Sequence, residues 1–547
     1  MKRYVIGIDF GTLSGRAVLV DSDTGREMAS SVLNYPHAVM ESTLPDGTPL
    51  SPDTALQHPL DYVEVLKTVI PAVLSEGKVD PAEVVAVGID FTTCTMLPTL
   101  EDGTPLCLLP EFEHEPQAYV KLWKHHSAVA EAEALNRIAA ERGEPWHARY
   151  SGAVSCEWAF PKIWEILNRA PHVYDATERF YEAADWVSLV LTGTEIHSPS
   201  FAGCKWLWNE VDGFPSDDFF RALDPRLSGI IGTKVASSVA DPSGIAGTLS
   251  ARAAQLTGLR EGTVVALPRP DAHAALPGLN MIGDGEMILT VGTSGCQILN
   301  AIEEKKVSGI CGYVKDSIIP GYYTYEGGQA AVGDMFDWFV RNCVPAADVE
   351  AAKAEGVSLH AYLRRRAKEL RVGESGLLAM DWFNGNRNPL NRPDLSGLIV
   401  GLTLQTKPYE IYRALIEASA FGLRAILDQF RQGGLPLRKI CAGGGIPRKD
   451  DLLMQIYADV LNLPISVTST DQAGALGSAV AAVVAAGICD SYAQASERLA
   501  PTPCALYTPI PENVAAYDRL YALRQRLQDT FGTGEFRDLM PTLRNFR

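Results

Sequence analysis

A carboxylate beside a short glycine turn is the first feature of the chain that could do chemistry. Asp9 ends an apolar run over residues 5–8, and the apolar pattern resumes at Ala17. Small and hydroxyl residues lie between them: Gly11, Thr12, Ser14 and Gly15. This pattern predicts two strands joined by a tight turn. Backbone N–H groups and hydroxyls in such a turn can bind phosphate, and Asp9 can hold a hydrated Mg²⁺.

Two well-known phosphate motifs do not fit this segment. Walker and dinucleotide fingerprints need glycines that open onto a helix, and here a second strand follows the turn. Taken alone, an ordinary hairpin with a glycine turn explains the segment nearly as well. Other parts of the chain favour the phosphate interpretation.

A second segment repeats this logic in the other half of the chain. Residues 287–299 are predicted to form strand, turn and strand, with Gly292, Thr293 and Ser294 in the turn. Two phosphate-type hairpins indicate two related domains that face one cleft. We place the boundary near Gly283, with domains at residues 1–283 and 284–547.

Two glycine-rich segments near the end of the chain complete the set. Residues 443–445 are three glycines between a predicted strand at 440–442 and a predicted helix. They suit a backbone that passes close to a flat ligand, although a generous turn is the alternative. Residues 473–479 open a helix whose small side chains would allow close packing on a sheet.

Length and composition limit the class of protein. A chain of 547 residues exceeds one hydrophobic core, and its 46% apolar and 21% charged residues are ordinary for a globular protein. A net charge of −18 argues against nucleic-acid and anionic-membrane partners. The ten cysteines contain no C-x-x-C pair and fit a reducing cytoplasm. No histidines show metal-ligand spacing, so we assign them no metal role.

Several further elements follow from periodicity. Helices are predicted over residues 59–75, 118–142, 157–167 and 511–531, and a buried strand over 84–90. The last helix could pack on its own domain, which we favour, or on a partner in a homodimer. The apolar run 473–488 is too short and too rich in glycine for a membrane span, so a buried helix is expected.

Together these segments resemble the FGGY family of sugar kinases, whose superfamily includes hexokinase and actin. The resemblance covers nearly the whole chain. It rests on residues 9–12, Glu157, Lys162 and Trp164, and residues 271–273, 292–294, 443–445 and 475–477. Longer stretches at 57–62, 90–98, 120–126, 183–186, 321–329 and 381–387 are most similar to the ribulokinase branch of the family.

The resemblance implies an α/β fold of two actin/hexokinase-like (ribonuclease H-like) domains and a cytoplasmic enzyme. It implies transfer of phosphate from ATP, with Mg²⁺, to the terminal hydroxyl of a ketopentose, L-ribulose, in arabinose breakdown. Asp271 would be the catalytic base. The sugar would contact Thr93, Trp123, Lys205, Asp271 and Glu326. ATP and its metal would contact Asp9, Gly11, Thr12, Ser14, Arg16, Gly292, Thr293, Ser294, Gly444, Gly445 and Lys449, with Gln329 and Asp334 nearby.

The chain departs from the family just before the expected base. Pro268, Arg269 and Pro270 stand where a glycine-containing turn is usual, and Arg269 adds a charge beside Asp271. This departure keeps a catalytically weak sugar sensor open as an alternative. Other FGGY kinases, for xylulose, ribitol or glycerol, and an actin-like ATPase are the remaining alternatives, and the sugar stereoisomer is open.

Overall fold

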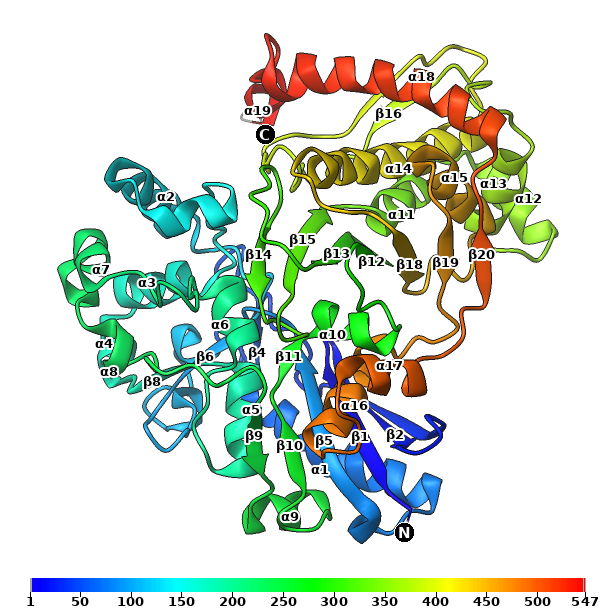
Figure 1. Cartoon of the computed structure of the whole chain (residues 1–547). Helices are drawn as coiled ribbons and strands as arrows, with labels where there is room; N and C mark the ends of the chain where they lie inside the picture. The colour runs from blue at the N-terminus through cyan, green and yellow to red at the C-terminus, as the bar shows by residue number, and fades with distance from the viewer. Residues whose placement is uncertain (1, 545, 547) are drawn as a thin grey trace. The chain divides into compact units, whose positions relative to one another are not determined.

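The computed structural model describes residues 2–544 and 546, which form two compact α/β units. Unit 1 consists of Met1–Ile282, Tyr313–Thr324 and Gln472–Ala500. Unit 2 consists of Gly283–Gly312, Tyr325–Asp471 and Pro501–Arg547. Each unit is therefore assembled from separate stretches of the chain, as the colours of Figure 1 show.

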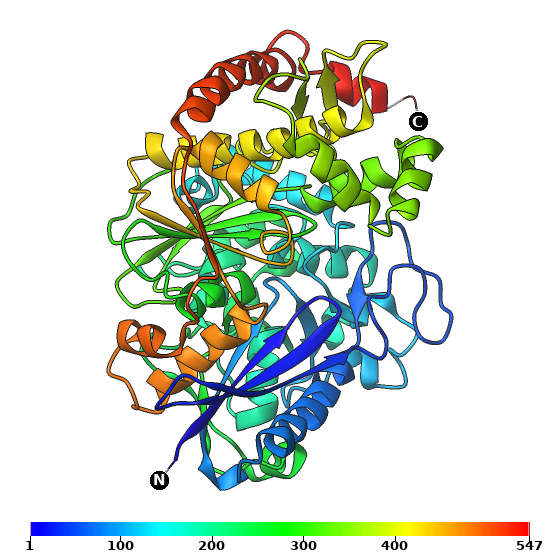
Figure 2. The ribbon, with the colours of Figure 1, turned by 90° about the vertical axis from the view of Figure 1, so that its right-hand side faces the viewer.

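The main sheet of unit 1 has the strand order β3-β2-β1-β5-β10-β9, with β11 also paired to β5. Its strands are β1 (Tyr4–Phe10), β2 (Ser14–Asp21), β3 (Glu27–Asn34), β5 (Val84–Phe91), β9 (Ile245–Thr248), β10 (Val264–Ala266) and β11 (Arg269–Pro270). The predicted hairpin is confirmed, because β1 and β2 are antiparallel neighbours. β5 and β10 continue the sheet in parallel, and Figure 2 shows the hairpin with α1 beside it.

A repeated Gly-Ile-Asp-Phe sequence lets a helix approach this sheet closely. Residues 7–10 and 88–91 pair in register on β1 and β5. A Cβ on Gly7 would lie 1.8 Å from the carbonyl oxygen of Ala475, and one on Gly88 would lie 1.9 Å from that of Ser478. Both carbonyls belong to α16 (Ala473–Ala485), whose backbone rests directly on the two strands. The expected buried helix with close sheet packing is confirmed.

A second, smaller sheet in unit 1 has the order β4-β7-β6-β8. Its strands are β4 (Leu56–Gln57), β6 (Met96–Thr99), β7 (Val120–Lys121) and β8 (Arg179–Glu182). The predicted helix over 118–142 is wrong in its first half, because residues 120–121 pair with β4 and β6 and the helix starts only at Val129. Strand pairing and the burial of Lys121 override the local helical pattern here.

Unit 1 contains further helices besides α16, and several of them contact its strands. They are α1 (Pro59–Gly77), α2 (Val129–Arg142), α3 (Ala159–Arg169), α4 (Pro171–Ala176), α5 (Ala183–Thr192), α6 (Pro199–Lys205), α7 (Asp217–Leu223), α8 (Ile230–Thr233), α9 (Ala251–Thr257), α10 (Asp271–Gly278) and α17 (Tyr492–Leu499). The predicted helices at 59–75 and 157–167 are confirmed as α1 and α3 with small shifts at their ends.

Unit 2 repeats the sheet topology of unit 1. Its strand order β15-β13-β12-β18-β19-β20 again has an antiparallel hairpin, two parallel strands and an antiparallel edge strand. The strands are β12 (Glu286–Val291), β13 (Gly295–Ala301), β15 (Tyr323–Gln329), β18 (Lys439–Gly443), β19 (Ile465–Val467) and β20 (Ala505–Tyr507). The short strand β14 (Gly312–Lys315) precedes β15 in the order of this sheet, whereas β16 (Leu378–Met380) and β17 (Leu398–Val400) form a separate two-stranded sheet. The expectation of two related domains is confirmed.

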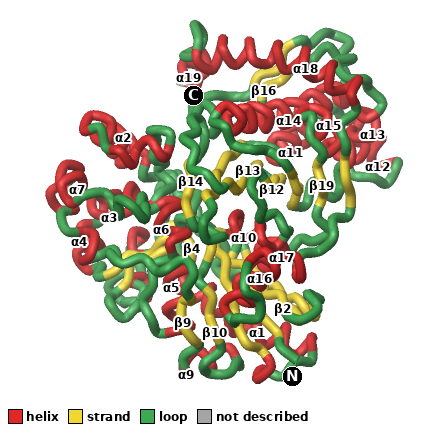
Figure 3. Tube along the Cα trace, viewed as in Figure 1, coloured by secondary structure: helices red, strands yellow, loops and turns green. Residues whose placement is uncertain are grey.

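The helices of unit 2 gather on one side of its sheet in the view of Figure 3. They are α11 (Gly333–Asn342), α12 (Ala346–Ala354), α13 (Leu359–Lys368), α14 (Pro408–Gln432), α15 (Asp451–Leu461), α18 (Pro511–Leu527) and α19 (Leu539–Arg544). The predicted C-terminal helix is α18, and it packs on its own unit. Its Tyr517 is buried, accepts a hydrogen bond from Arg413 at 2.7 Å and donates to Glu417 at 3.0 Å.

Candidate functional site

Acidic side chains gather at one edge of the unit 1 sheet. Asp9 and Asp90 pair in register near the carboxyl ends of parallel strands β1 and β5. Arg269 pairs with Asp90 on β11, and the chain then turns into α10 at Asp271. The carboxyl ends of parallel strands are the edge at which α/β sheets bind ligands. The topology thus brings Asp9, a candidate from the sequence, next to Asp90. Asp271 follows directly after β11, which pairs with the end of β5.

The two strand-end carboxylates differ in their environment. Asp90 is fully buried; its Oδ2 accepts a hydrogen bond from Ser478 at 2.6 Å, and its Oδ1 meets no donor among the described residues. Burial, followed by the charge of Asp9, raises the pKa of Asp90 well above its ordinary value. Burial also raises the pKa of Asp9, but Arg16 opposes this from 3.3 Å. Asp90 therefore keeps its proton more readily than Asp9.

Asp271 is the first residue of α10 and is half-buried. Its Oδ1 accepts a hydrogen bond from the Ala272 N–H at 2.7 Å. The N-cap of α10 is Pro270, which makes no side-chain cap bond, so Asp271 is not the helix cap; its carboxylate lies in the first turn of the helix, where negative charge is stabilised. His273, two residues on, contacts Ser317 Oγ through Nδ1 at 2.8 Å.

The unusual Arg269 points into the protein interior. Its side chain is buried and donates to Ser200 Oγ at 3.2 Å, to the Ser317 carbonyl at 2.5 Å and to Tyr492 Oη at 2.7 Å. Among these partners only neutral oxygens occur. Arg269 therefore ties β11 to α6, α17 and the segment 313–324, which gives the departure from the family pattern a structural role.

Several of the expected sugar-contacting residues lie near one another in unit 1. Trp123 is half-buried, and its indole N–H donates to Thr12 Oγ1 in the β1–β2 turn at 3.0 Å. Lys205 ends α6, and its carbonyl lies 4.0 Å from the thiol of Cys94. Cys94 follows Thr93, so Thr93 and Lys205 belong to neighbouring segments. Trp123 lies in the loop after β7, outside any helix, so core packing on a helix does not explain it.

The expected nucleotide-contacting residues of unit 2 surround a second turn. Gly292, Thr293 and Ser294 join β12 to β13. The Gly292 carbonyl accepts from the N–H of Gly333, the first residue of α11, at 2.9 Å, and the Thr293 carbonyl accepts from the preceding Val332 at 2.8 Å. Gly444 has φ +100°, and a Cβ on it would lie 2.6 Å from the Val291 carbonyl oxygen. Gly445 has open space around it. The triple glycine thus lies beside the hairpin turn.

The other unit 2 candidates differ in exposure. Lys449 and Asp334 are exposed, and Glu326 on β15 is half-buried. Gln329 lies in the core, where its amide nitrogen donates to Asp381 at 3.0 Å and to the Ser419 carbonyl at 2.8 Å. These bonds occupy the amide that the sequence analysis placed near the nucleotide.

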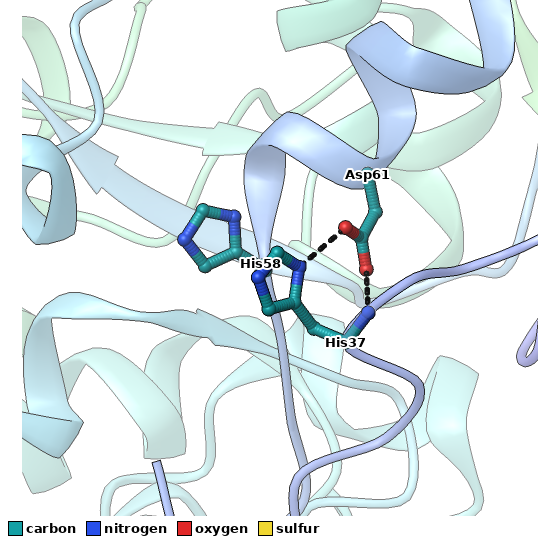
Figure 4. A group of neighbouring side chains, drawn as sticks. All are labelled: His37, His58 and Asp61. Atoms are coloured by element: carbon teal, nitrogen blue, oxygen red, sulfur yellow. Dashed lines mark hydrogen bonds and ion pairs between the residues drawn. The ribbon is translucent and has the colours of Figure 1, made fainter. Parts of the chain in front are cut away.

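Three potential metal ligands meet at the start of α1 (Figure 4). His37 binds both carboxylate oxygens of Asp61, through Nδ1 at 2.6 Å and its backbone N–H at 3.1 Å. His58 stacks on His37 with ring centroids 4.2 Å apart and caps the helix by accepting from the Leu60 N–H. Burial lowers the pKa of His58 to about 4. These bonds explain the cluster without a metal ion: they hold the loop that carries His37 against the start of α1.

Sequence reasoning missed Asp90 as a member of the site. The available signal was the repetition of Gly-Ile-Asp-Phe at residues 7–10 and 88–91. Two buried strands that end in the same four residues place two carboxylates at neighbouring positions when they pair in parallel, as β1 and β5 do.

Comparisons with known proteins agree with this geometry. Residues 287–486 match the model of the FGGY family of carbohydrate kinases, C-terminal domain. The chain is 51% identical to a ribulokinase of Anoxybacillus flavithermus, covering 100% of this chain and 97% of the relative. It is 44% identical to a ribulokinase of Mycolicibacterium smegmatis, covering 100% and 96%.

Solved structures share the fold. A crystal structure of a xylulose kinase from Rhodospirillum rubrum matches with a TM-score of 0.80 at 23% identity, covering 97% of this chain and 99% of that one. The Plasmodium falciparum glycerol kinase with ADP matches with a TM-score of 0.76 at 18% identity, covering 96% and 98%. The expected two-domain actin/hexokinase-like α/β fold is confirmed. The full-length relatives, together with the match to the family model, show that this chain belongs to the FGGY family of carbohydrate kinases.

Proposed function

We propose that this carbohydrate kinase transfers the γ-phosphoryl group of ATP to the terminal hydroxyl of L-ribulose and forms L-ribulose 5-phosphate. The observation that carries the proposal is the edge of unit 1 where Asp9 and Asp90 meet and the chain enters α10 at Asp271. Full-length similarity to proteins named ribulokinase supports the choice of sugar.

Asp271 takes the proton of the attacking hydroxyl. Phosphoryl transfer asks mainly for positioning and charge neutralisation, plus one acceptor for this proton. A half-buried carboxylate, held at the first turn of α10 by the Ala272 N–H, suits that role. The hydrogen bonds of Arg269 hold β11, the strand that leads into Asp271. Pro268 and Pro270 therefore stiffen a segment that these bonds already hold in place.

Thr93, Trp123 and Lys205 bind the ketose on the side of unit 1, and Glu326 contributes from unit 2. An indole offers an apolar wall, while a lysine and carboxylates offer hydrogen bonds to sugar hydroxyls. The indole N–H of Trp123 is already held by Thr12, which fixes the ring orientation. Differences of one hydroxyl between ketoses are then read by a few hydrogen bonds.

The phosphates of ATP lie against the two hairpin turns. Gly11, Thr12, Ser14 and Arg16 serve from unit 1, and Gly292, Thr293 and Ser294 from unit 2. Gly444, Gly445 and Lys449 face the rest of the nucleotide. Backbone N–H groups and hydroxyls at such turns suit anionic oxygens.

The donor set at the strand ends fits Mg²⁺. Asp9 offers a carboxylate, the hard oxygen ligand that Mg²⁺ prefers, and the neighbouring Asp90 adds a buried oxygen that meets no donor among the described residues. When bound there, Mg²⁺ would neutralise charge on the phosphates. Asp9 would hold it, directly or through a water molecule.

The proposed setting is the cytoplasm. The ten cysteines are scattered along the sequence without a C-x-x-C pair, a pattern that fits a reducing compartment. Among residues 2–544 and 546, no helix combines the length and apolarity that a membrane crossing requires.

The test is ADP release by the purified protein with Mg-ATP and L-ribulose, D-ribulose, D-xylulose, ribitol or glycerol, compared with no sugar. The proposal expects the highest kcat/KM with L-ribulose and little turnover without sugar. A higher kcat/KM with another polyol would change the substrate but keep the mechanism. Equal turnover without sugar would contradict a kinase function and indicate an ATPase.

A further inference from the structure

We propose that Lys162 is a positioning residue that holds two sugar-binding segments of unit 1 at a set distance from each other. Lys162 lies on α3 and is completely buried. The inference rests on the proposed function, because it concerns the segments that carry Thr93 and Trp123.

One ammonium group joins the two segments through their main chains. Lys162 Nζ donates to the Cys94 carbonyl at 2.7 Å and to the Leu122 carbonyl at 2.8 Å. Cys94 directly follows Thr93, and Leu122 directly precedes Trp123. The two carbonyls are 28 positions apart in sequence, and the Lys162 ammonium is a donor that they share.

The Cys94 turn needs such support. Cys94 has φ +61°, in the left-handed region that residues other than glycine adopt only with backbone strain. The turn lies between β5 and β6, outside the strand ladder. A charge-assisted bond to its carbonyl stabilises this conformation more strongly than a neutral donor would.

A buried carboxylate holds the other end of the same turn. Glu182 Oε1 accepts from the Thr95 N–H at 3.1 Å, and its Oε2 accepts from Trp206 at 2.6 Å. Glu182, like Lys162, has no exposed surface. A buried ammonium and a buried carboxylate are both expensive unless they are fully bonded, so two of them on one four-residue turn indicate that its shape matters.

The turn also reaches the third sugar-binding segment. The Cys94 thiol lies 4.0 Å from the Lys205 carbonyl at the end of α6. A change in the position of Cys94 therefore displaces Thr93 directly and acts on Lys205 and Trp123 through its neighbours. Removal of the ammonium should weaken sugar binding in particular, since the two carbonyls that Lys162 binds adjoin sugar candidates of unit 1 and none of the nucleotide candidates of unit 2.

A second lysine of unit 1 provides a matched control. Lys234 also joins two main-chain carbonyls, those of Tyr174 at 3.0 Å and of Thr177. It is half-buried, and neither carbonyl neighbours an expected sugar residue. A purely structural effect of losing a carbonyl-bridging lysine should therefore appear in Lys234→Met as well.

The experiment compares wild type, Lys162→Met, Lys162→Arg and Lys234→Met by steady-state kinetics, with sugar and ATP varied separately, and by thermal unfolding. Lys162→Met should raise the KM for L-ribulose about tenfold or more and leave the KM for ATP within about twofold. Lys162→Arg keeps the positive charge, so it should fold more readily than Lys162→Met. It should also raise the KM for L-ribulose more than the KM for ATP, but by a smaller factor. Lys234→Met should lower Tm with both KM values unchanged.

Equal changes in the two KM values for both Lys162 variants would overturn the proposal, and so would a sugar effect of the same size in Lys234→Met. If Lys162→Met does not fold, the test rests on Lys162→Arg, for which the change in the KM for L-ribulose is compared with the change in the KM for ATP. The wild-type sugar panel tests the proposed function separately. If wild type prefers another sugar, the ratio is measured with that sugar.

Discussion

The two hairpins of the molecule share a topology but differ in charge. In unit 1, Asp9 on β1 pairs with Asp90 on the neighbouring parallel strand. At the equivalent register in unit 2, Thr290 on β12 pairs with Gly443. The antiparallel partners differ as well: Arg16 faces Asp9, whereas Cys296 faces Thr290.

This difference shows how one sheet plan can serve two kinds of chemistry. Carboxylates at the strand ends of unit 1 suit a metal ion and proton transfer. Glycine and hydroxyl residues at the same place in unit 2 leave the backbone open to a ligand without adding charge. The following predictions test this division of labour.

The largest effect is expected at the proton acceptor of unit 1. Asp271→Asn should lower kcat by about 10³-fold or more and leave L-ribulose binding within about tenfold, because the amide keeps the position but cannot accept the proton. Calorimetric sugar binding and single-turnover kinetics separate the two effects. Asp217→Asn is the control, since Asp217 also begins a helix, α7, but lies outside the site. Undiminished turnover in Asp271→Asn would remove this residue from the role.

A smaller loss is expected at the strand end that distinguishes the units. Asp9→Asn should lower kcat about 100-fold and raise the Mg²⁺ concentration needed for half-maximal rate, because a metal-binding carboxylate is lost. Thr290→Val, at the equivalent position of unit 2, should change kcat less than about threefold. Similar losses in both variants would show that the two hairpins do not divide the chemistry as described.

A third prediction concerns Lys205, an expected sugar-binding residue of unit 1. Lys205→Ala should raise the KM for L-ribulose about tenfold with a smaller effect on the KM for ATP, because it removes a hydrogen-bond donor from unit 1 alone. Initial rates with each substrate varied in turn measure this. An equal rise in both KM values would count against a contact between Lys205 and the sugar.

The smallest effect is expected at the triple glycine of unit 2. Gly445 has open space around it, so Gly445→Ala should leave Tm unchanged and raise the KM for ATP a few-fold by crowding the nucleotide. Gly444→Ala should instead lower Tm, because φ is +100° and the added Cβ would meet the Val291 carbonyl. If Gly445→Ala changed only the sugar KM, the nucleotide assignment of this turn would be wrong.

The hairpins, the two related sheets and helices α1, α3, α16 and α18 could be predicted because each depends on local patterns. Period-two and period-3.6 hydrophobicity and glycine turns mark them directly. The strand at 120–121 could not be predicted in this way, because two residues form a strand only when distant partners β4 and β6 are in place.

The same limit applies to the site. Asp9 and the turn residues stand out by their types, and Asp271 by its motif. The buried orientation of Arg269 and the role of Lys162 depend on partners far along the chain, such as Tyr492 and Cys94. The return of residues 472–500 to unit 1 likewise follows from tertiary packing of α16 on Gly7 and Gly88.

The most direct test of the account is a phosphorus NMR measurement of products from Mg-ATP and L-ribulose with the wild-type protein. The account predicts one L-ribulose 5-phosphate for each ADP, and neither product in appreciable amount with Asp271→Asn. ADP and inorganic phosphate without sugar phosphate would contradict it, because ATP would then be hydrolysed and not used to phosphorylate the sugar.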